Sequence, residues 1–193
     1  MRIASPSRLM MTARTDKEAR LKDFIVEGLL RRGDVSDSNA PLMIVVRNNE
    51  SPVARALCAA LSENPEAAVD IKIIFGGASG EEPAAAAPLQ DIEGAEFRVI
   101  DDPRFAAAHE QMVVGNTHVW IGDCLRRDPT KRDAFELYHR ADQSVHLFTA
   151  ASFVKLWASA KPMKQPKDGA VSPEIIAAGQ ADSGYSRPRD HRH

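Results

Sequence analysis

This sequence has no long apolar run, no large excess of positive or negative charge and only two cysteines, and each of these features excludes a class of protein. No apolar run reaches the roughly 18 residues that a membrane-spanning helix needs, and the polar start MRIASPSRLMMTARTDKEAR lacks a signal-peptide core. The formal net charge of the 193 residues is -2, so no overall field marks a nucleic-acid or membrane-surface binder, although local basic patches stay compatible with it. We therefore expect a cytoplasmic protein.

The two cysteines, Cys58 and Cys124, have a spacing that fits neither a disulfide framework nor a zinc knuckle. We expect two reduced and mostly buried thiols. With 44% hydrophobic residues, a chain of 193 residues is long enough for one domain with a real core. We expect a flexible N-terminus at 1–14, a single domain at 15–162 and a disordered, polar, proline-rich tail at 163–193.

The first half of this domain carries the pattern of a strand, a helix and a second strand. A continuous apolar run at 42–46 predicts a strand buried on both faces, and a similar run follows at 69–75. Between them, Ser51 before Pro52 predicts a helix start, with the helix continuing to Leu61. Because the loop NNESP has no glycine-rich phosphate pattern, we interpret Ser51 only as a helix cap. The two strands should be parallel, which predicts an α/β fold.

Shorter patterns predict the remaining elements. They are a helix from the capping box at Thr15 to Gly33, a surface loop at 76–88, a strand at 96–100, a short helix at 133–140, a strand at 143–148 and a final helix at 149–160.

The stretch from His109 to Asp123 predicts a β-hairpin. Two short runs of β-formers, 112–114 and 119–121, flank a segment of turn residues at 115–118. His109 should then lie at the open end of the hairpin, beside Gly122 and Asp123. If the chain has a site, this is the place where we expect it.

The histidines of the chain have structural as well as chemical interpretations. A lone histidine at a strand end, such as His109, is often a hydrogen-bonded structural residue rather than a nucleophile. We expect His118 in the turn and His139 on the short helix to be exposed, and His146 to be packed within a strand. Together His109, His118 and Asp123 match no standard set of metal ligands, so we expect neither a metal nor another cofactor.

The order of these elements resembles one half of the phospholipase D superfamily. That pattern has a strand, a helix, a strand, a variable loop, another strand and a hairpin that begins with His-x-Lys, four residues and Asp. The resemblance covers 42–161 and includes the ending FVKLWASAKP, which is similar to the family's final Phe-x-x-x-Trp helix. It implies a mixed β-sheet flanked by helices on both faces.

The resemblance also implies roles for residues of the hairpin. In the family the histidine attacks a phosphodiester, lysine and asparagine hold phosphate oxygens, and aspartate orients the imidazole. Here His109 takes the nucleophile position, Gln111 the lysine position and Asn116 the aspartate position. The family's Gly-Ser step corresponds to Gly122 and Asp123, one residue early, and no asparagine follows it in CLRRD.

These departures change the charge of the implied site. Gln111 lacks the positive charge that would neutralise a phosphate, and Asn116 cannot stabilise an imidazolium as a carboxylate does. Asp123 adds a negative charge where phosphate would lie, unless it pairs with Arg126, Arg127 or a metal. We therefore expect a degenerate motif and a protein that is catalytically silent or impaired.

The family's active site is made from two such halves, which implies a homodimer for a chain with one. The two copies of His109 would meet at a two-fold axis, with the hairpin at or near the interface. Trp120, next to this predicted interface, is then either an interface residue or a core residue.

Three functions remain open. The first is a dimeric binding or scaffold module for a phosphate-containing ligand or nucleic acid, gripped through Arg126 and Arg127 with Lys131 and Arg132; the alternative for these residues is a solvated charged loop. The second is an active phosphodiesterase or nuclease in which His109 becomes a phosphohistidine. The third is an unrelated α/β domain whose resemblance is coincidental.

Overall fold

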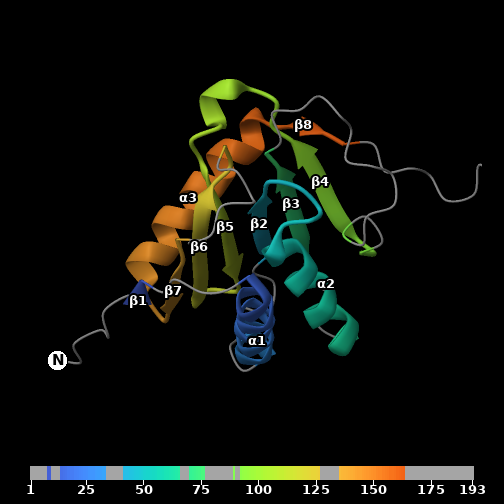
Figure 1. Ribbon diagram of the computed structural model, residues 1–193, viewed down its shortest axis with the longest axis vertical. Helices are drawn as coiled ribbons and strands as arrows, with labels where there is room; N and C mark the ends of the chain where they lie inside the picture. Colours follow the sequence, from blue (N-terminus) through green and yellow to red (C-terminus); the bar gives the residue numbers. More distant parts are fainter. Residues whose placement is uncertain are drawn as a thin grey trace, which may run out of the picture.

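The computed structural model describes residues 8–9, 14–33, 41–65, 70–76, 89, 92–126 and 135–163. Within these residues one eight-stranded sheet has the order β1-β7-β6-β5-β2-β3-β4-β8 (Figure 1). The strands are β1 (Arg8–Leu9), β2 (Leu42–Val46), β3 (Ile71–Phe75), β4 (Ala95–Val99), β5 (His109–Val114), β6 (His118–Cys124), β7 (Leu137–Arg140) and β8 (Lys161–Pro162).

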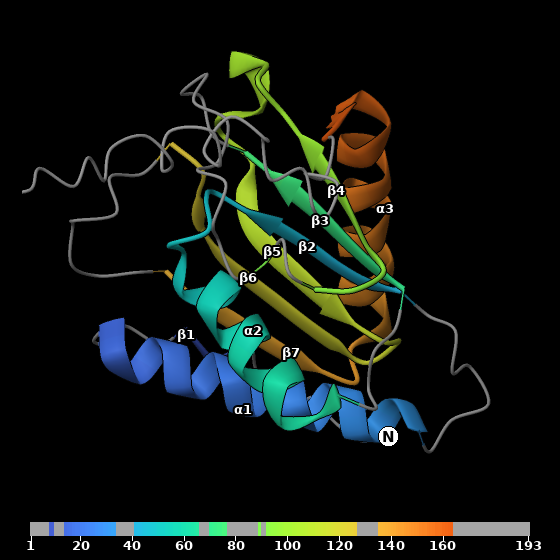
Figure 2. The same ribbon diagram turned by 90° about the vertical axis from the view of Figure 1, so that its right-hand side faces the viewer.

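Helices cover both faces of the sheet. Helices α1 (Arg14–Gly33) and α2 (Pro52–Glu63) lie on one face, and α3 (Gln143–Ser159) lies on the other (Figure 2). The predicted α/β class, with a mixed sheet between helices, is confirmed. None of the helices in the described ranges is long and apolar enough to cross a membrane.

The predicted strand-helix-strand unit is confirmed. β2 pairs in parallel with β3, from Leu42 opposite Ile71 to Val46 opposite Phe75, and α2 connects the two strands. All five residues of β2 are buried, as expected for a strand covered on both faces. β4 extends the parallel part of the sheet beyond β3. The carboxyl ends of β2, β3 and β4 therefore share one edge of the sheet.

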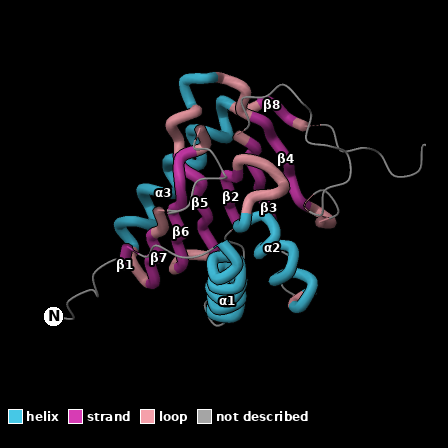
Figure 3. Tube along the Cα trace, viewed as in Figure 1, coloured by secondary structure: helices cyan, strands magenta, loops and turns pink. Residues whose placement is uncertain are grey.

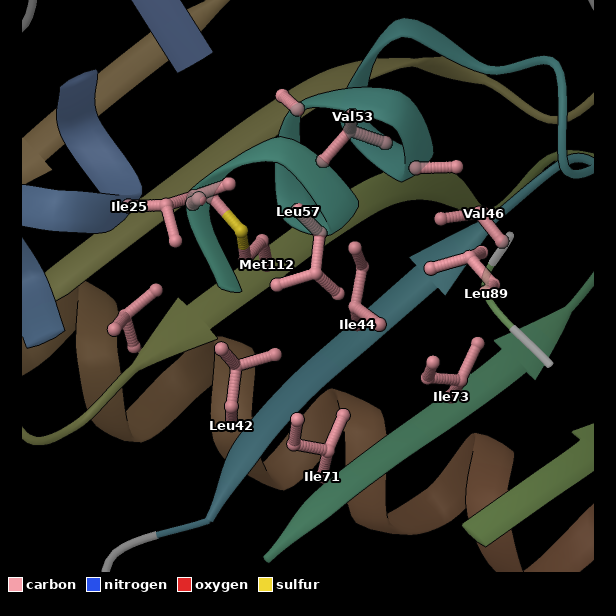
Figure 4. Close-up of a cluster of buried hydrophobic side chains, with 14 of the residues drawn as sticks. Ile25, Leu42, Ile44, Val46, Val53, Leu57, Ile71, Ile73, Leu89 and Met112 are labelled. Atoms are coloured by element: carbon pink, nitrogen blue, oxygen red, sulfur yellow. The ribbon is translucent and has the colours of Figure 1, made fainter. Parts of the chain in front are cut away.

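The sheet divides the hydrophobic core into two clusters. The larger cluster fills the space below α1 and α2, where Leu57 of α2 lies over Ile44 and Met112 of the sheet (Figure 4). The smaller cluster joins Val45, Val113 and Val119 to Phe153 and Leu156 of α3. Both faces of the central strands β2 and β5 are thus used for packing.

Trp120 belongs to the larger cluster. Its side chain is fully buried, so the structure supports the core interpretation of this residue rather than the interface interpretation.

The helix predicted at 133–140 is wrong. Residues Leu137–Arg140 form β7, which pairs antiparallel with β6, and 133–134 lie outside the described residues. Glu136 is fully buried and pairs with Lys17 at 3.0 Å. Burial raises the pKa of Glu136, against the opposing effect of Lys17. The spacing of Phe135 and Tyr138 suggested a helical face, but pairing with β6 determines the conformation.

The strand predicted at 143–148 is also wrong, because α3 begins at Gln143 rather than at Thr149. Asp142 is the N-cap, and its side chain accepts a hydrogen bond from the Val145 backbone N–H. The end of α3 at Ser159 agrees with the predicted end of the final helix. The β-forming residues Val145, Leu147 and Phe148 are accommodated in this well-capped helix.

Two predicted segments lie mostly outside the described residues. Of the loop at 76–88 the structure describes only Gly76, and of the tail it describes only Met163. Within the N-terminal segment 1–14, Arg8 and Leu9 form β1 and pair with β7, a strand that the sequence did not predict. The remainder of 1–13 is not described.

Candidate functional site at the open end of the hairpin

The predicted hairpin is present as β5 and β6, which lie side by side in the sheet (Figure 3). His109 pairs with Cys124, whereas Gln111 pairs with Ile121. Two steps along β5 thus correspond to three along β6, so β6 contains a β-bulge at Gly122 and Asp123. Bulges of this kind bend a strand and redirect side chains, and they are common beside active sites. This bulge lies directly beside His109.

The ring of His109 is held at one nitrogen. Its Nδ1 lies 2.7 Å from the carbonyl oxygen of Gly122. Because a carbonyl oxygen can only accept, Nδ1 must carry the proton, and Nε2 then bears the lone pair when the ring is neutral. The residue is exposed, and its ring centroid lies 6.0 Å from that of Phe135. Among the described residues, no group forms a hydrogen bond with Nε2.

The residue that supplies this carbonyl has to be glycine. A Cβ added at Gly122 would lie 2.3 Å from Cη2 of the buried Trp120 ring. No side chain fits there unless the ring moves. The contact with Trp120 therefore fixes the bulge, and the bulge in turn places the Gly122 carbonyl against His109.

Glu110, the next residue along β5, is buried with 3% of its surface exposed. Its Oε1 accepts hydrogen bonds from the Arg47 backbone N–H at 3.0 Å and from the Ser51 hydroxyl at 2.7 Å. The carboxylate joins the end of β2, the start of α2 and the start of β5. The prediction that Ser51 is only a helix cap is wrong, because its side chain makes no capping bond and donates to Glu110 instead.

Arg47 closes the other side of this network. Its Nε donates to the Leu125 carbonyl at 2.7 Å, and its Nη2 donates to the Cys124 carbonyl at 2.9 Å. The guanidinium therefore binds the last residue of β6 and the residue after it. Arg47, which directly follows β2, thus serves to hold the backbone.

Glu110 and Arg47 were missed by the sequence reasoning. Glu110 offered a signal, since a carboxylate at the start of a strand whose other residues are largely apolar needs a partner. Arg47 offered a weaker signal, because it directly follows a strand buried on both faces. Neither signal identifies the partner, which comes from elements far apart in the sequence.

No protein-family model matches the chain, and neither does any curated protein sequence. Solved structures do match. One is Nuc from Salmonella typhimurium, a phospholipase D family member, with a TM-score of 0.54 and 14% identity over 82% of this chain and 99% of Nuc. The chain has the phospholipase D fold. The coincidental-resemblance alternative is thereby excluded at the level of fold.

Two further structures are similar at the same level. NucT from Helicobacter pylori has a TM-score of 0.53 and 10% identity, over 82% of this chain and 99% of NucT. TrmBL2, an archaeal chromatin protein with a novel mode of DNA binding, has a TM-score of 0.53 and 12% identity, over 83% of this chain. This chain spans only 56% of TrmBL2. At these identities the likeness concerns the fold alone.

On this phospholipase D fold, two of the predicted site residues do not join His109 at the surface. Gln111 is buried, with 7% exposure, and its Nε2 has no hydrogen-bond partner in the described part of the chain. Asn116 is exposed in the turn between β5 and β6, at the opposite end of the hairpin. Neither residue is placed to contact a ligand bound at His109.

The other predicted residues lie in the bulge or beyond it. Asp123 is partly buried, and its Oδ1 accepts a hydrogen bond from the Phe135 backbone N–H at 3.0 Å, which ties the bulge to the segment before β7. Arg126 is exposed, and its backbone N–H donates to the Ala106 carbonyl. Arg127 lies outside the described residues. His109, Asp123 and Arg126 thus share one end of the hairpin.

The remaining histidines differ from the predictions. His118 is fully buried rather than exposed, and its Nδ1 lies 2.8 Å from the Thr117 hydroxyl. His139 lies on β7 with only 9% of its side chain exposed. His146 lies on α3, where its Nε2 is 3.1 Å from the Gly115 carbonyl. In the described residues no group of three or more His, Cys, Asp or Glu could hold a metal ion.

His118 packs against side chains of α1. Its Nε2 is 3.5 Å from Glu27, whose other oxygen binds Arg140 at 2.8 Å, and its ring meets Phe24 edge-on. Burial lowers the pKa of His118, although the Glu27 carboxylate acts in the opposite direction. Burial also raises the pKa of Glu27, but the hydrogen bond and charge of Arg140 outweigh this effect and lower it overall. His118 is therefore a neutral structural residue near pH 7.

Proposed function

We propose that this chain is a binding or scaffold module on the phospholipase D fold, catalytically silent or impaired, that works as a homodimer. One observation carries the proposal. Within the described residues, the position of the family's lysine holds Gln111, which is a buried amide, and the Arg47 guanidinium binds two carbonyls. We infer from this that the motif is degenerate.

The chemistry explains why these positions matter. Attack of an imidazole nitrogen on a phosphodiester builds negative charge on the phosphoryl oxygens, which enzymes stabilise with cations or aimed donors. Here the neighbour on the bulge is Asp123, a carboxylate. A carboxylate can neither donate a hydrogen bond to the phosphoryl oxygens nor neutralise the negative charge that develops on them during attack. The His109 edge is thus better suited to binding than to cleavage.

The ligand we propose contains phosphate, with nucleic acid as the leading candidate. Arg126 is exposed at the site and makes no ion pair within the described residues, and Arg127, Lys131 and Arg132 follow it in the sequence. Such arginines supply sequence-independent phosphate contacts. The fold of TrmBL2, which binds DNA, makes DNA the first ligand to test.

The test uses fluorescence anisotropy with a labelled DNA duplex at two salt concentrations. We expect salt-dependent binding that weakens at least threefold in Arg126→Ala, with a salt slope reduced by about one. Lys22→Ala is the matched control, since Lys22 is a cation on α1 at a distance in sequence from the site. Equal binding by wild type and Arg126→Ala would contradict the assignment of the ligand.

A second function is favoured by one observation. The free Nε2 of His109, with Nδ1 fixed by the Gly122 carbonyl, is the geometry of a nucleophilic or basic imidazole. An active phosphodiesterase using this residue would hydrolyse bis(p-nitrophenyl) phosphate, and His109→Ala would abolish the turnover. We expect wild type and His109→Ala to be equally inactive.

A further inference from the structure

One aromatic side chain at the open end of the hairpin has no place in the hydrophobic core. Phe135 is partly exposed, and among the described residues it belongs to neither of the two core clusters. Its ring lies instead beside the exposed His109, with 6.0 Å between the ring centroids and 53° between the ring planes. Core packing therefore does not account for a phenylalanine at this position.

The backbone on both sides of the Phe135 ring is held in place. The Phe135 N–H donates to Asp123 Oδ1 at 3.0 Å, which ties it to the bulge. The next residue, Glu136, is fully buried and pairs with Lys17 of α1 at 3.0 Å. Binding costs less free energy when the contacting group is already ordered. Phe135 is thus a preorganised aromatic surface beside the candidate site.

A cation lies at the same end of the hairpin. Arg126 is exposed, and its backbone N–H donates to the Ala106 carbonyl at 3.0 Å, so the start of its side chain is fixed. Proteins that bind single-stranded nucleic acid combine such cations, which contact the phosphates, with aromatic rings on which the bases stack. The open end of the hairpin supplies both kinds of group.

We propose that Phe135 stacks on an unpaired base of single-stranded DNA whose phosphate is bound at Arg126. The proposal rests on the phosphate-binding function proposed above and names the form of its ligand. An unpaired base offers a flat face to the ring directly. In a duplex the faces are covered by neighbouring bases, and reaching one requires unpairing and unstacking, which cost free energy. The site should therefore prefer a single strand to a duplex.

The alternative role for Phe135 is to brace the imidazole of His109. The two roles differ in the side chains that can replace phenylalanine. Any bulky apolar group can brace an imidazole, whereas only an aromatic ring can stack on a base. Bracing would also act equally on every ligand bound at His109, with or without a base. Substitutions at this one position therefore distinguish the two roles.

The first experiment measures binding of the full chain to labelled oligothymidylate by fluorescence anisotropy. An abasic strand with the same number of phosphates is the second ligand. We expect Phe135→Ala to bind oligothymidylate about tenfold more weakly than wild type does. On the abasic strand the two proteins should bind equally, because no base is present to stack. Equal affinities of the two proteins for oligothymidylate would overturn the proposal, as would an equal loss on both strands.

Two further variants separate stacking from apolar packing. Phe135→Trp keeps an aromatic face and should bind oligothymidylate at least as tightly as wild type. Phe135→Leu keeps the apolar character without the ring and should bind as weakly as Phe135→Ala. Full binding by the leucine variant would overturn stacking. Phe148→Ala is the matched control, since it removes a 76% exposed phenylalanine from α3, and the same loss in that variant would also overturn the proposal.

The second experiment leaves an aromatic ring in place and so does not depend on how a truncated variant folds. In Phe135→Trp, stacking should quench the indole fluorescence when oligothymidylate is added, and the abasic strand should leave it unchanged. Wild type, which contains Trp120 and Trp157, gives the background signal. No quenching above this background at saturating oligothymidylate would overturn the stacked arrangement.

The outcomes separate the stacked base from the proposed function. A chain that binds neither oligothymidylate nor a duplex overturns both. DNA binding that depends on Arg126 but is unchanged in Phe135→Ala overturns the stacked base and leaves the phosphate-binding function supported. A duplex bound as tightly as oligothymidylate would overturn the preference for a single strand. Much tighter binding of oligouridylate than of oligothymidylate would overturn the assignment to DNA.

Discussion

The two ends of the β5–β6 hairpin each hold a histidine, and the two residues are used in opposite ways. At the turn, His118 is fully buried, lies 3.5 Å from Glu27 and packs on Phe24. At the open end, His109 is exposed, with one nitrogen bound to the Gly122 carbonyl. The same side chain thus stabilises the fold at one end and presents a free nitrogen at the other.

The comparison teaches that side chains from several elements meet at the open end, as they do at the turn. Glu110, Ser51 and Arg47 connect three elements there, and the Gly122 bulge is fixed by Trp120. In the described structure no group forms a hydrogen bond with Nε2 of His109. A connected network beside one unused imidazole nitrogen is what distinguishes this candidate site from a packed strand end.

The largest expected effect is at the open end, in Ser51→Asp. Aspartate is a good N-cap, so a purely capping role predicts little change. Next to the buried Glu110 carboxylate it places a second negative charge, and we expect a loss of about 3 kcal/mol of unfolding free energy at pH 8. Denaturant unfolding measures the change, with Ser51→Thr as the control that keeps the hydroxyl. Equal stability of Ser51→Asp and wild type would show that the Ser51 side chain does not contact the Glu110 carboxylate.

Gly122→Ala should cost about 2 kcal/mol, because the added Cβ overlaps the Trp120 ring. The double-mutant cycle with Trp120→Phe isolates this contact. In the Trp120→Phe background, the smaller ring leaves space, and Gly122→Ala should cost clearly less. An equal cost in both backgrounds would mean that Trp120 does not fix the bulge.

The two histidines give the direct contrast. His118→Ala removes a buried ring and should cost about 2 kcal/mol, whereas His109→Ala removes an exposed one and should change stability by less than about 0.5 kcal/mol. Thermal and denaturant unfolding of both variants under the same conditions provide the measurement. A reversed order would refute the assignment of one structural and one solvent-facing histidine.

The smallest effect is a pH dependence at the turn end. The pKa of His118 is lowered by burial, so below about pH 6.5 the unfolded chain takes up a proton that the folded chain resists. Its contribution to stability is complete above that pH and is lost as pH falls toward the folded pKa. Between pH 7.5 and 5.5, unfolding free energy should decline, and less steeply in His118→Leu. Parallel pH curves for the two proteins would show that His118 does not titrate in this way.

The hairpin and the strand-helix-strand unit were predictable because local patterns determine them. The apolar run at 42–46 and the turn residues at 115–118 agree with their tertiary surroundings, so periodicity alone sufficed. The segment 143–148 was not predictable from its β-forming residues, since α3 covers the sheet there. Asp142, whose side chain caps the helix, was the available local signal.

The hairpin was predictable, but the set of side chains that gathers at its open end was not. His109 and Asp123 lie together at the open end, as the hairpin pattern indicated. The family spacing assigned Gln111 and Asn116 to the same site, but Gln111 is buried within the sheet and Asn116 lies in the turn at the opposite end of the hairpin. Glu110 was missed because its partners, Arg47 and Ser51, become neighbours only in the folded sheet.

The central claim is that the His109 edge binds a phosphodiester without cleaving it. Intact-mass spectrometry of the full chain, after incubation with excess DNA or a phosphodiester under binding conditions, tests it most directly. The account predicts an unmodified protein mass together with intact ligand. A covalent phosphoryl adduct that maps to His109, and is absent in His109→Ala, would contradict it and establish a phosphohistidine enzyme.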